Sequence, residues 1–415
     1  MKLTLSQNKA LESLSGEGNV FLTGPAGTGK SFLINYYIKN YDPQIPVVCS
    51  TGAAAVLVGG RTFHSFFGLG TLQESHEWIL ASALANENLV RRIQKAKAII
   101  IDEISMLSGR ALDLANLICK SVRNQPELPF GGIRIVAVGD FYQLPPVKND
   151  FNKKIEWAFK SFTWDECQFE SFELKEFMRS TDLEFLDFLS QIRAGRCGDK
   201  EKKFLNDHLF KKNEPFVGTR IFARKKLVQE YNEESLAKLE GKEIVFKTKY
   251  DGEDKAIERL KRNLPIEDEI KVKEGAFVMI RSNDNSRNQA YVNGTLGHIE
   301  YVLSTEVVIK TLDGRQINLP KQNFFLNDGA GNLIAEASNF PISLAYAITI
   351  HKSQGATISQ GVVDLYNLWD SGQGYTALSR LSSPEGLRIL KWNQRSIFID
   401  REVVEFYKKI NKPLV

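Results

Sequence analysis

The segment GPAGTGKS at residues 24–31 constrains the fold and chemistry of this chain more than any other part of its sequence. An apolar run precedes it at residues 19–23, and the residues after Lys30 carry apolar side chains at helical spacing. This order predicts a strand, a glycine-rich loop and a helix, an arrangement in which backbone N–H groups and the positive end of the helix surround phosphate oxygens. The nucleotide-binding residues predicted here are Gly24, Pro25, Ala26, Gly27, Thr28, Gly29, Lys30 and Ser31.

Charged and hydroxyl side chains at and after this loop suit reactions at phosphate. Lys30 would reach the β- and γ-phosphates, and the Ser31 hydroxyl would ligate magnesium. A second apolar strand candidate, AIIID at residues 98–102, ends in one carboxylate and is followed by another. We expect Asp102 to hold magnesium, directly or through water, and Glu103 to act as the general base that orients the attacking water. The predicted reaction is therefore hydrolysis of a nucleoside triphosphate.

Apolar strand candidates alternate with helical segments through the first part of the chain. Residues 98–102 and 133–140 are apolar on both faces, and residues 111–122 between them have the pattern of an amphipathic helix. Such strands are typical of a parallel sheet covered by helices on both sides, so the predicted fold class is α/β. After a Pro-Pro pair at 145–146, aromatic helical segments precede another apolar strand at 219–223, which indicates a second α/β unit.

The second unit contains stretches of a different character. Residues 241–273 carry 17 charged side chains in 33 positions, which predicts a solvated linker or a surface hairpin. From residue 275 to 325, short strand candidates alternate with Asn-Gly and Asp-Gly turns, the pattern of a small all-β insertion. The predicted division is residues 1–172 for the first unit and 173–415 for the second, with the insertion at about 241–338.

Composition excludes several classes of protein. The longest apolar run, residues 53–58, is far too short to cross a bilayer, so we expect no membrane association. No basic segment leads into an apolar stretch near the N-terminus, so neither a secretory nor an organellar signal is visible and the expected location is the cytoplasm. The cysteines match no paired metal-ligand spacing, and the net charge of +4 is too small to indicate nucleic acid by itself.

Residues farther along the chain decide what hydrolysis is coupled to. Asp140 and Gln143 follow the third core strand, a position from which a polar side chain senses the γ-phosphate. Arg179 and Arg380 lie in the second unit, where they complete the phosphate site only if two domains close over one nucleotide. The predicted catalytic residues are Lys30, Glu103, Gln143, Arg179 and Arg380.

Ordered segments along the chain carry a resemblance to a known family. They are GPAGTGKS, STGAAAVLVGGRTFHSFFG, IIIDEISML, PFGGIRIVAVGDFYQLPPV, LAYAITIHKSQGATIS and GQGYTALSR. In this order they are similar to the motifs of superfamily-one 5′-to-3′ DNA helicases, and they resemble most closely the Pif-one family, which is related to RecD and to the phage Dda helicase. The likeness runs from about Leu3 to Tyr407, so it covers nearly the whole chain.

The resemblance implies a fold of two RecA-like P-loop domains, with ATP and Mg²⁺ as cofactors. It also implies that Gln7 reads adenine, that Arg179 and Arg380 are arginine fingers, and that Gly355 approaches the nucleotide and DNA with its backbone. Single-stranded DNA would lie across both domains, where hydroxyls, amides and lysine grip phosphates while aromatic or imidazole rings stack on bases. The implied DNA contacts are Thr51, Gly52, Thr62, Phe63, His64, Thr349, His351 and Lys352.

The same resemblance implies two accessory elements. A small excursion in the first domain, at about residues 66–92, would form a pin that splits the duplex, although Phe66 and Phe67 fit a hydrophobic core equally well. The β insertion in the second domain would be a barrel similar to src-homology-three domains, which helps to enclose or steer DNA. His64 and His351 fit core or capping roles as well as base stacking.

Together with the predicted hydrolysis of a nucleoside triphosphate, the resemblance implies an ATP-dependent 5′-to-3′ DNA helicase that works as a monomer on single-stranded DNA and on forked or structured DNA. Two other interpretations stay open: a DNA-stimulated ATPase that translocates without unwinding, and a P-loop enzyme of another class such as a small-molecule kinase. A non-catalytic DNA clamp would require that Lys30 be dispensable. Because the chain begins shortly before Gln7 and ends soon after the last motif, we expect no long terminal extensions.

Overall fold

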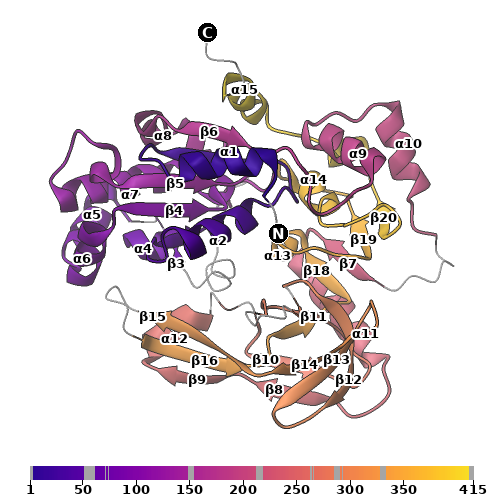
Figure 1. Cartoon of the computed structure of the whole chain (residues 1–415). Coiled ribbons are helices and arrows are strands. Elements are labelled where there is room, and N and C mark those ends of the chain that lie inside the picture. Colours follow the sequence, from indigo (N-terminus) through magenta and orange to yellow (C-terminus); the bar gives the residue numbers. More distant parts are fainter. Residues whose placement is uncertain are drawn as a thin grey trace.

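The computed structural model of the chain describes residues 3–50, 61–70, 72, 74–147, 154–211, 218–261, 264, 266–284, 290–291, 293–327 and 333–410. Figure 1 shows three lobes: an α/β lobe with the N-terminal part of the chain, a second α/β lobe beside it, and a β-rich lobe below them. Within the described residues, no helix has both the length and the apolar character needed to span a bilayer.

The first lobe is built on a six-stranded sheet of order β3-β2-β4-β5-β1-β6, in which all neighbouring strands are parallel. Its strands are β1 (Val20–Thr23), β2 (Val47–Cys49), β3 (Arg61–Thr62), β4 (Ala98–Asp102), β5 (Arg134–Val138) and β6 (Glu170–Glu173). Its α-helices are α1 (Leu5–Leu14), α2 (Lys30–Asn40), α4 (Phe63–Phe67), α5 (His76–Leu84), α6 (Glu87–Lys95), α7 (Gly109–Arg123) and α8 (Phe162–Cys167). Short 3-10 turns are η1 (Ile104–Met106), η2 (Pro129–Gly132) and η3 (Ala158–Lys160).

Alternating side chains of these strands form a hydrophobic core on each face of the sheet. Ile100 and Val136 face the core shared with α1 and α2, whereas Ile99 and Ile135 face the core shared with α7. The sheet is therefore covered on both sides, which confirms the prediction from strands that are apolar on both faces. Because the strands are parallel, their carboxyl ends meet at one edge, where the loops after β1, β4 and β5 lie close together.

The second lobe contains a sheet of four parallel strands in the order β18-β7-β19-β20. These strands are β7 (Thr219–Phe222), β18 (Ala347–Thr349), β19 (Gly361–Asp364) and β20 (Leu387–Lys391). The accompanying helices are α9 (Leu183–Arg193), α10 (Asp199–Asp207), α11 (Lys225–Ala237), α13 (Ile350–Ser353), α14 (Gln373–Leu378) and the 3-10 turn η4 (Gln394–Ser396). The predicted second α/β unit is thus present, and β7 is the strand expected at 219–223.

The β-rich lobe lies in the chain between α11 and β18. It has a five-stranded antiparallel sheet of order β14-β13-β12-β11-β17, a three-stranded sheet β15-β16-β9 and the pair β10-β8. Its core includes Val278, Ile309 and Phe340. The elements are β8 (Ile244–Lys247), β9 (Lys249–Gly252), α12 (Asp254–Lys261), β10 (Glu269–Val272), β11 (Phe277–Ile280), β12 (Leu296–Val302), β13 (Glu306–Thr311), β14 (Gln316–Pro320), β15 (Gln322–Asn327), β16 (Leu333–Asn339) and β17 (Ile342–Leu344). The likeness of this insertion to a src-homology-three barrel stays a prediction.

The highly charged stretch at 241–273 is folded, so the prediction of a solvated linker or surface hairpin is wrong. It contributes β8, β9, α12 and β10, and its apolar residues Leu260, Ile270 and Val272 are buried in the core of the insertion. β8 pairs with β10 and β9 pairs with β16, so the two adjacent strands do not form a hairpin with each other. The high density of charged residues did not reveal these strands. A half-buried strand needs an apolar side chain only at every second position, so charged residues can occupy the positions between.

The last helix, α15 (Arg401–Ile410), packs back on the first lobe, above α8 and β6 in Figure 1. The ring centroid of Phe406 lies 6.0 Å from that of Phe21 in β1. The Tyr407 hydroxyl lies 2.7 Å from Thr23 Oγ1, also in β1. The C-terminal helix therefore packs with the first sheet, although the predicted boundary at residue 172 assigned it to the second unit.

Candidate nucleotide and nucleic-acid site

The predicted phosphate loop connects β1 to α2 at the carboxyl edge of the first sheet. Gly29 precedes α2 with a left-handed backbone (φ 84°), and a Cβ added there would lie 2.7 Å from Gln7 Nε2. Gly27 also has a positive φ (83°), and a Cβ added there would lie 2.7 Å from the Cβ of Arg179. Glycine at these positions lets the loop turn tightly while side chains from elsewhere come close to it.

Lys30 begins α2 and is partly buried against this loop. Its Nζ donates hydrogen bonds to the carbonyl oxygens of Gly24 (2.7 Å) and Pro25 (3.0 Å). Burial lowers the pKa of Lys30, while nearby carboxylates, of which Asp140 has the largest effect, act to raise it. The ammonium group is thus held by carbonyl oxygens at the place where phosphate oxygens are expected.

Two acidic side chains stand at the end of β4. Asp102 Oδ1 accepts a hydrogen bond from the Glu103 N–H at 2.9 Å. Burial, followed by the charge of Glu103, raises the pKa of Asp102 to about 7, and burial also raises the pKa of Glu103. Glu103 has a left-handed backbone (φ 53°), an uncommon conformation that functional sites often hold. Gln354 Nε2 donates to Glu103 Oε2 at 3.0 Å, so the carboxylate predicted to act as the base has a fixed orientation.

The side chains around this point fit the magnesium ion that the sequence predicts. Ser31 and Asp102 line the same cavity and offer a hydroxyl and a carboxylate oxygen, the kind of ligand that Mg²⁺ prefers. Glu103 lies next to Asp102, and a divalent cation would offset the repulsion between the two carboxylates. The chemistry of the donor set therefore suits this metal.

Arg179 reaches the phosphate loop from the segment that follows β6. Its Nε donates to Thr357 Oγ1 at 3.1 Å, and its Nη1 donates to the carbonyl oxygen of Ser379 at 2.6 Å. Burial, followed by the charge of Arg380, lowers the pKa of Arg179 to about 9. Among the residues that the structure describes, no carboxylate forms an ion pair with this guanidinium, as suits a group that is to meet phosphate.

Arg380 follows α14 and faces the same cavity, although it is only 2% exposed. Its Nε donates to the carbonyl oxygen of Thr376 at 2.9 Å, and its Nη2 donates to Ser379 Oγ at 2.9 Å. Gln143 Oε1, from the first lobe, lies 3.5 Å from the same Nη2. The glutamine predicted to sense the γ-phosphate and one of the predicted arginine fingers are therefore within contact distance.

One cavity of about 420 Å³ lies between the two α/β lobes. Its lining combines predicted residues from both lobes: Ala26, Gly27, Gly29, Lys30, Ser31, Asp102, Glu103, Gln143, Arg179, Gly355 and Arg380. The sequence did not single out the other residues of the lining: Phe32, Met178 and Thr357.

Three residues of the phosphate loop lie outside this lining. Gly24 and Pro25 accept hydrogen bonds from Lys30 with their carbonyl oxygens, and Thr28 Oγ1 donates to the Pro25 carbonyl oxygen at 2.9 Å. The geometry brings these residues together, and their roles in catalysis stay predictions.

Gln7 lies beside the phosphate loop and outside the lining of this cavity. It is 1% exposed, its Oε1 accepts a hydrogen bond from the Thr4 N–H at 3.1 Å, and its Nε2 donates to the Thr28 carbonyl oxygen at 3.3 Å. The amide is therefore engaged within the protein in this structure. Its reading of adenine stays a prediction.

A charged and aromatic network joins the lobes behind the cavity. Asp140, which is fully buried, forms an ion pair with Arg193 of α9 through distances of 3.0 Å (Nη2 to Oδ1) and 3.1 Å (Nε to Oδ2). Glu173 lies 3.2 Å from Arg193 Nη1. The Arg193 guanidinium also lies over the rings of Tyr142 (4.6 Å) and Tyr407 (5.3 Å). The sequence pointed to Asp140 as a phosphate sensor and gave no sign of this partner.

Helix α14 connects the second lobe directly to the phosphate loop. The Tyr375 hydroxyl accepts a hydrogen bond from the Ala26 N–H at 2.9 Å. Gly372, at the start of α14, approaches the loop after β5 so closely that an added Cβ would lie 2.3 Å from the Gln143 carbonyl oxygen. Both residues belong to the segment GQGYTALSR, so closer attention to that motif would have found them. No motif in the sequence points to Arg193 in the same way.

The predicted DNA contacts near β3 are only partly available to a ligand. Thr62 Oγ1 caps α4 by accepting a hydrogen bond from the Ser65 N–H at 3.2 Å. Phe63 is fully buried, with its ring centroid 4.7 Å from that of Phe67. A ring inside the core cannot stack on a base, so the structure contradicts the predicted role of Phe63. Burial lowers the pKa of His64, which keeps its imidazole neutral at pH 7.

The contacts predicted in the second lobe lie around the start of α13. Thr349 is buried and caps this helix, since its Oγ1 accepts a hydrogen bond from the Lys352 N–H at 3.0 Å. Burial lowers the pKa of His351. The Lys352 side chain is 52% exposed, and its Nζ lies 3.8 Å from Glu267 of the insertion, so it is the member of this group most accessible to phosphate. Two predicted contacts lie outside the described residues: Thr51 and Gly52.

The excursion predicted as a pin contains α5, α6 and the end of α4. Phe66 and Phe67 are 4% and 0% exposed, so of the two roles left open for them the structure supports packing in the core. Trp78 of α5 is 59% exposed and is the large apolar side chain in this region that solvent reaches most. The pin stays a prediction, and the two phenylalanines are not its tip.

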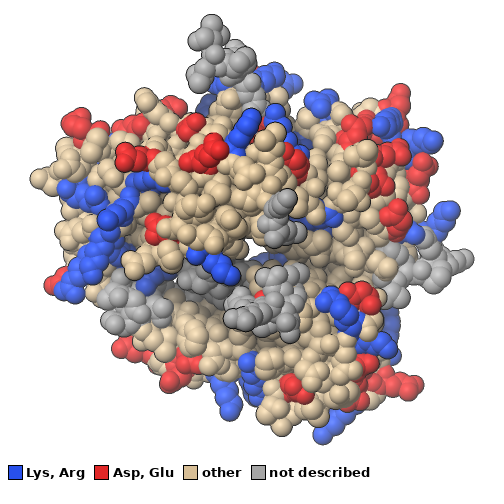
Figure 2. All heavy atoms as spheres, in the orientation of Figure 1, with Lys and Arg blue, Asp and Glu red and all other residues tan. Residues whose placement is uncertain are grey.

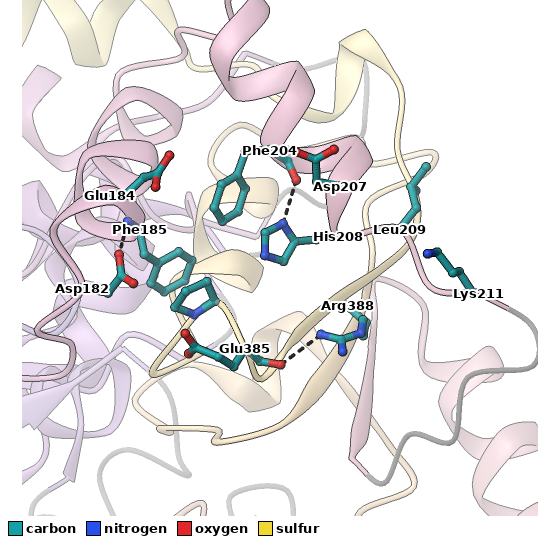
Figure 3. Close-up of a pocket in the computed structure, with 11 residues that line it drawn as sticks. Asp182, Glu184, Phe185, Phe204, Asp207, His208, Leu209, Lys211, Glu385 and Arg388 are labelled. Atoms are coloured by element: carbon teal, nitrogen blue, oxygen red, sulfur yellow. Dashed lines mark hydrogen bonds between the residues drawn. The ribbon is translucent and has the colours of Figure 1, made fainter.

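A second cavity, of about 780 Å³, lies in the second lobe next to α9 and α10. Figure 3 shows Phe204 and His208 within it, with His208 Nδ1 at 2.8 Å from the Phe204 carbonyl oxygen. Its charged lining is of mixed sign: Asp182, Glu184, Asp207, Lys211, Glu385 and Arg388. No residue predicted for the nucleotide or DNA lines it, and the mixed charge gives no reason to expect a polyanion there.

Charged side chains of both signs are scattered over the face of the molecule in Figure 2, and a hollow lies near its centre between the lobes. Lys and Arg are interspersed with Asp and Glu over this face, so no broad basic field dominates it. With a net charge of only +4, binding of a nucleic acid would depend on local contacts.

Comparison with known proteins adds to this geometry. The PIF1-like helicase family matches residues 2–203 of the chain. The ATP-dependent DNA helicase Pif1 of Bdellovibrio bacteriovorus is 42% identical over 410 residues, which cover 99% of this chain and 92% of that protein.

Solved structures match nearly the whole chain. The crystal structure of Bacteroides sp. Pif1 in complex with ADP-AlF4 is 27% identical, covers 99% of this chain and 97% of that one, and has a TM-score of 0.83. The structure of Bacteroides Pif1 bound to single-stranded DNA is 28% identical, with 99% and 97% coverage and a TM-score of 0.68. Both α/β lobes and the β-rich insertion thus have counterparts in these structures.

Proposed function

This chain belongs to the Pif1 helicase family, and we propose that it is a motor that moves 5′-to-3′ along single-stranded DNA and separates the strands of a duplex ahead of it. Its two α/β lobes are RecA-like domains, and it is an ATP-dependent DNA helicase. The direction of movement, the use of Mg²⁺, the preference for forked or structured DNA and action as a monomer belong to the proposal.

One observation supports this proposal above the others: Arg179 and Arg380 line the same cavity as Lys30 and Ser31. The lysine and serine belong to the phosphate loop of the first domain, and the arginines come from parts of the chain beyond its sheet. A nucleotide in this cavity contacts both sides, so gain or loss of its γ-phosphate changes how strongly the domains hold together. A motor requires this coupling between hydrolysis and domain movement.

The positions of the side chains support the following part for each in hydrolysis. Lys30 would exchange its carbonyl partners for phosphate oxygens, and Glu103, oriented by Gln354, would accept a proton from the attacking water. Ser31 and Asp102 would hold the magnesium ion, which supplies neutralisation of the phosphate charge. The two arginines of the cavity would stabilise the charge on the transferred phosphoryl group.

Movement along DNA requires a DNA contact in each domain. The distance between the two contacts must change during the ATPase cycle. Lys352 is an accessible cation of the second domain among the predicted DNA contacts, and Thr62 lies at the end of β3 in the first domain. When the cavity closes on ATP, the distance between such contacts would shorten, and hydrolysis would lengthen it again. If the two domains hold the DNA tightly in turn, repetition of this change in distance gives directed movement.

A forked duplex with a single-stranded tail of one polarity tests the proposal. We expect ATP-dependent strand separation from a 5′ tail and not from a 3′ tail, with the isolated chain and no other protein. Lys30→Ala is the matched control, because it should bind DNA and lack turnover. Unwinding from the 3′ tail would refute the proposed direction, and ATPase that DNA stimulates without any strand separation would refute autonomous unwinding.

A further inference from the structure

Thr357 lines the nucleotide cavity and contacts one of the arginines assigned to hydrolysis. Arg179 Nε donates a hydrogen bond to Thr357 Oγ1 at 3.1 Å, and Arg179 Nη1 donates to the Ser379 carbonyl oxygen at 2.6 Å. A guanidinium is planar, so acceptors for two of its three nitrogen atoms fix both its position and its plane. Nη2, which takes part in neither contact, can then face a phosphate oxygen.

Arg179 is held by one domain at its backbone and by the other at its guanidinium. The N–H of the preceding residue, Met178, donates to the Gly27 carbonyl oxygen of the phosphate loop at 2.7 Å. The two acceptors of the guanidinium, in contrast, belong to the second RecA-like domain. The orientation of the guanidinium over the phosphate loop therefore depends on where the second domain places the Thr357 hydroxyl.

The backbone on both sides of Thr357 is fixed within the second domain. Ala356 and Ile358 are fully buried, and the Ile358 N–H donates to the Arg380 carbonyl oxygen at 2.9 Å. Threonine is branched at Cβ, which restricts its χ1 angle, so its hydroxyl follows the position of its backbone. A short segment thus carries the acceptor for Arg179 and is bonded to the backbone of Arg380.

A turn of the β insertion packs against this segment. Gly294 lies two residues before β12 with a left-handed backbone (φ 98°), and its N–H donates to the Ile280 carbonyl oxygen of β11 at 2.9 Å. A Cβ added at Gly294 would lie 3.0 Å from the Cβ of Ala356 and 3.3 Å from both the amide nitrogen and the carbonyl oxygen of Thr357. The insertion therefore touches the backbone of the residue whose side chain holds Arg179.

We propose that Thr357 is a positioning residue for Arg179 in ATP hydrolysis, and that the Gly294 turn of the β insertion holds Thr357 in place. This assignment rests on the proposed function, in which Arg179 stabilises charge on the transferred phosphoryl group. It gives the insertion an influence on the rate of hydrolysis through one hydroxyl group.

ATPase assays with a saturating single-stranded oligonucleotide test the positioning role. Thr357→Val keeps the shape of the side chain and removes the hydroxyl, so kcat should fall about 10-fold with little change in KM for ATP. Thr357→Ser restores the hydroxyl and should keep kcat within about 2-fold of the wild type. Ser359→Ala, which removes an exposed hydroxyl two positions further along, is the matched control and should leave kcat unchanged.

A double variant separates positioning from a purely structural role. If Thr357 acts through Arg179, Thr357→Val should have no further effect on the single-turnover rate once Arg179→Ala is present. Because the Thr357 side chain is exposed, Thr357→Val should also unfold at the same temperature as the wild type. Effects of the two substitutions that multiply would overturn the proposal, and so would a wild-type kcat in Thr357→Val.

A pair of glycine variants tests the contact with the insertion. Gly294→Ala forces the Thr357 backbone to shift and should lower kcat roughly 5-fold, since small misplacements of catalytic groups are costly. Gly314→Ala is the matched control: Gly314 lies between β13 and β14 of the same insertion, also has a positive φ (85°), and has no atom within 4 Å of an added Cβ. Equal kcat values in these two variants would overturn the role of the Gly294 turn.

Failure of the proposed function gives different results. A wild-type chain that hydrolyses ATP without separating strands would refute autonomous unwinding, and the ATPase variants would still decide the role of Thr357. An Arg179→Ala variant with wild-type kcat would refute the part assigned to Arg179 in hydrolysis and the role of Thr357 with it. Loss of turnover in Arg179→Ala with full turnover in Thr357→Val would overturn the positioning role alone.

Discussion

Substitution of Arg193 in α9 should destabilise the protein far more than substitution of Lys200, an exposed cation that forms an ion pair with Asp187 of the same helix. Asp140 is fully buried, and two contacts of 3.0 and 3.1 Å join its carboxylate to the Arg193 guanidinium. Arg193→Ala leaves this carboxylate in the interior without its counter-charge, and the loss of one partner from a buried pair costs about 3–5 kcal/mol. We therefore expect the free energy of unfolding to fall by about 4 kcal/mol.

The matched control is Lys200→Ala. Lys200 Nζ lies 2.8 Å from Asp187 Oδ2 of α9, but the two side chains are 62% and 47% exposed. An exposed pair of this kind contributes about 0–1 kcal/mol. Arg193→Ala removes a buried pair and, in addition, the contacts of Arg193 with Glu173, Tyr142 and Tyr407. The same reasoning predicts that Arg193→Gln combined with Asp140→Asn recovers much of the lost stability, because neutral amides replace both charges.

Equilibrium unfolding in urea, followed by tryptophan fluorescence, measures these differences. At an unchanged slope of free energy against urea, the midpoint should move strongly for Arg193→Ala and very little for Lys200→Ala. If the two variants unfold within about 1 kcal/mol of each other, the buried pair is not the support that its geometry indicates.

Other predictions concern the nucleotide site and the corrected DNA contact. Gln354→Ala should lower kcat of the DNA-stimulated ATPase roughly 10-fold with little change in KM for ATP, because it frees Glu103 without touching the phosphate loop; an unchanged kcat would show that Glu103 needs no such support. Chelation of divalent cations should abolish turnover and leave nucleotide-free binding of an oligonucleotide intact, and turnover that survives chelation would argue against the metal assigned to Ser31 and Asp102. Phe63→Ala should cost about 3–5 kcal/mol of stability as a core truncation; a fully stable variant with a selective loss of DNA affinity would restore the stacking role.

The features that could be predicted from the sequence are those with a local signal. The phosphate loop, the strand that ends at Asp102 and the parallel sheets follow from patterns within about a dozen residues, and they appear at the expected positions. The family resemblance placed the two arginines beside the loop, and the structure brings both to the same cavity.

Features that depend on distant partners were missed. Arg193 and Asp140 are 53 positions apart, and neither has a local pattern that reveals the other. Phe63 was placed among DNA contacts by its motif, but its burial is decided by the rings and helices that fold over it. Local patterns specify elements, whereas burial depends on how those elements are assembled.

The hydrogen bond between Tyr375 and Ala26 makes nucleotide binding and domain arrangement parts of one equilibrium. The Ala26 N–H belongs to the phosphate loop, and in this structure it donates to the hydroxyl of a helix from the other domain. A phosphate oxygen that takes this N–H must displace Tyr375, and Arg380, which follows the same helix, moves when that helix moves. Any ligand that shifts α14 therefore changes the affinity of the loop for nucleotide, and by linkage the nucleotide changes the affinity for that ligand by the same factor. If DNA is this ligand, the affinities for DNA and ATP must change together.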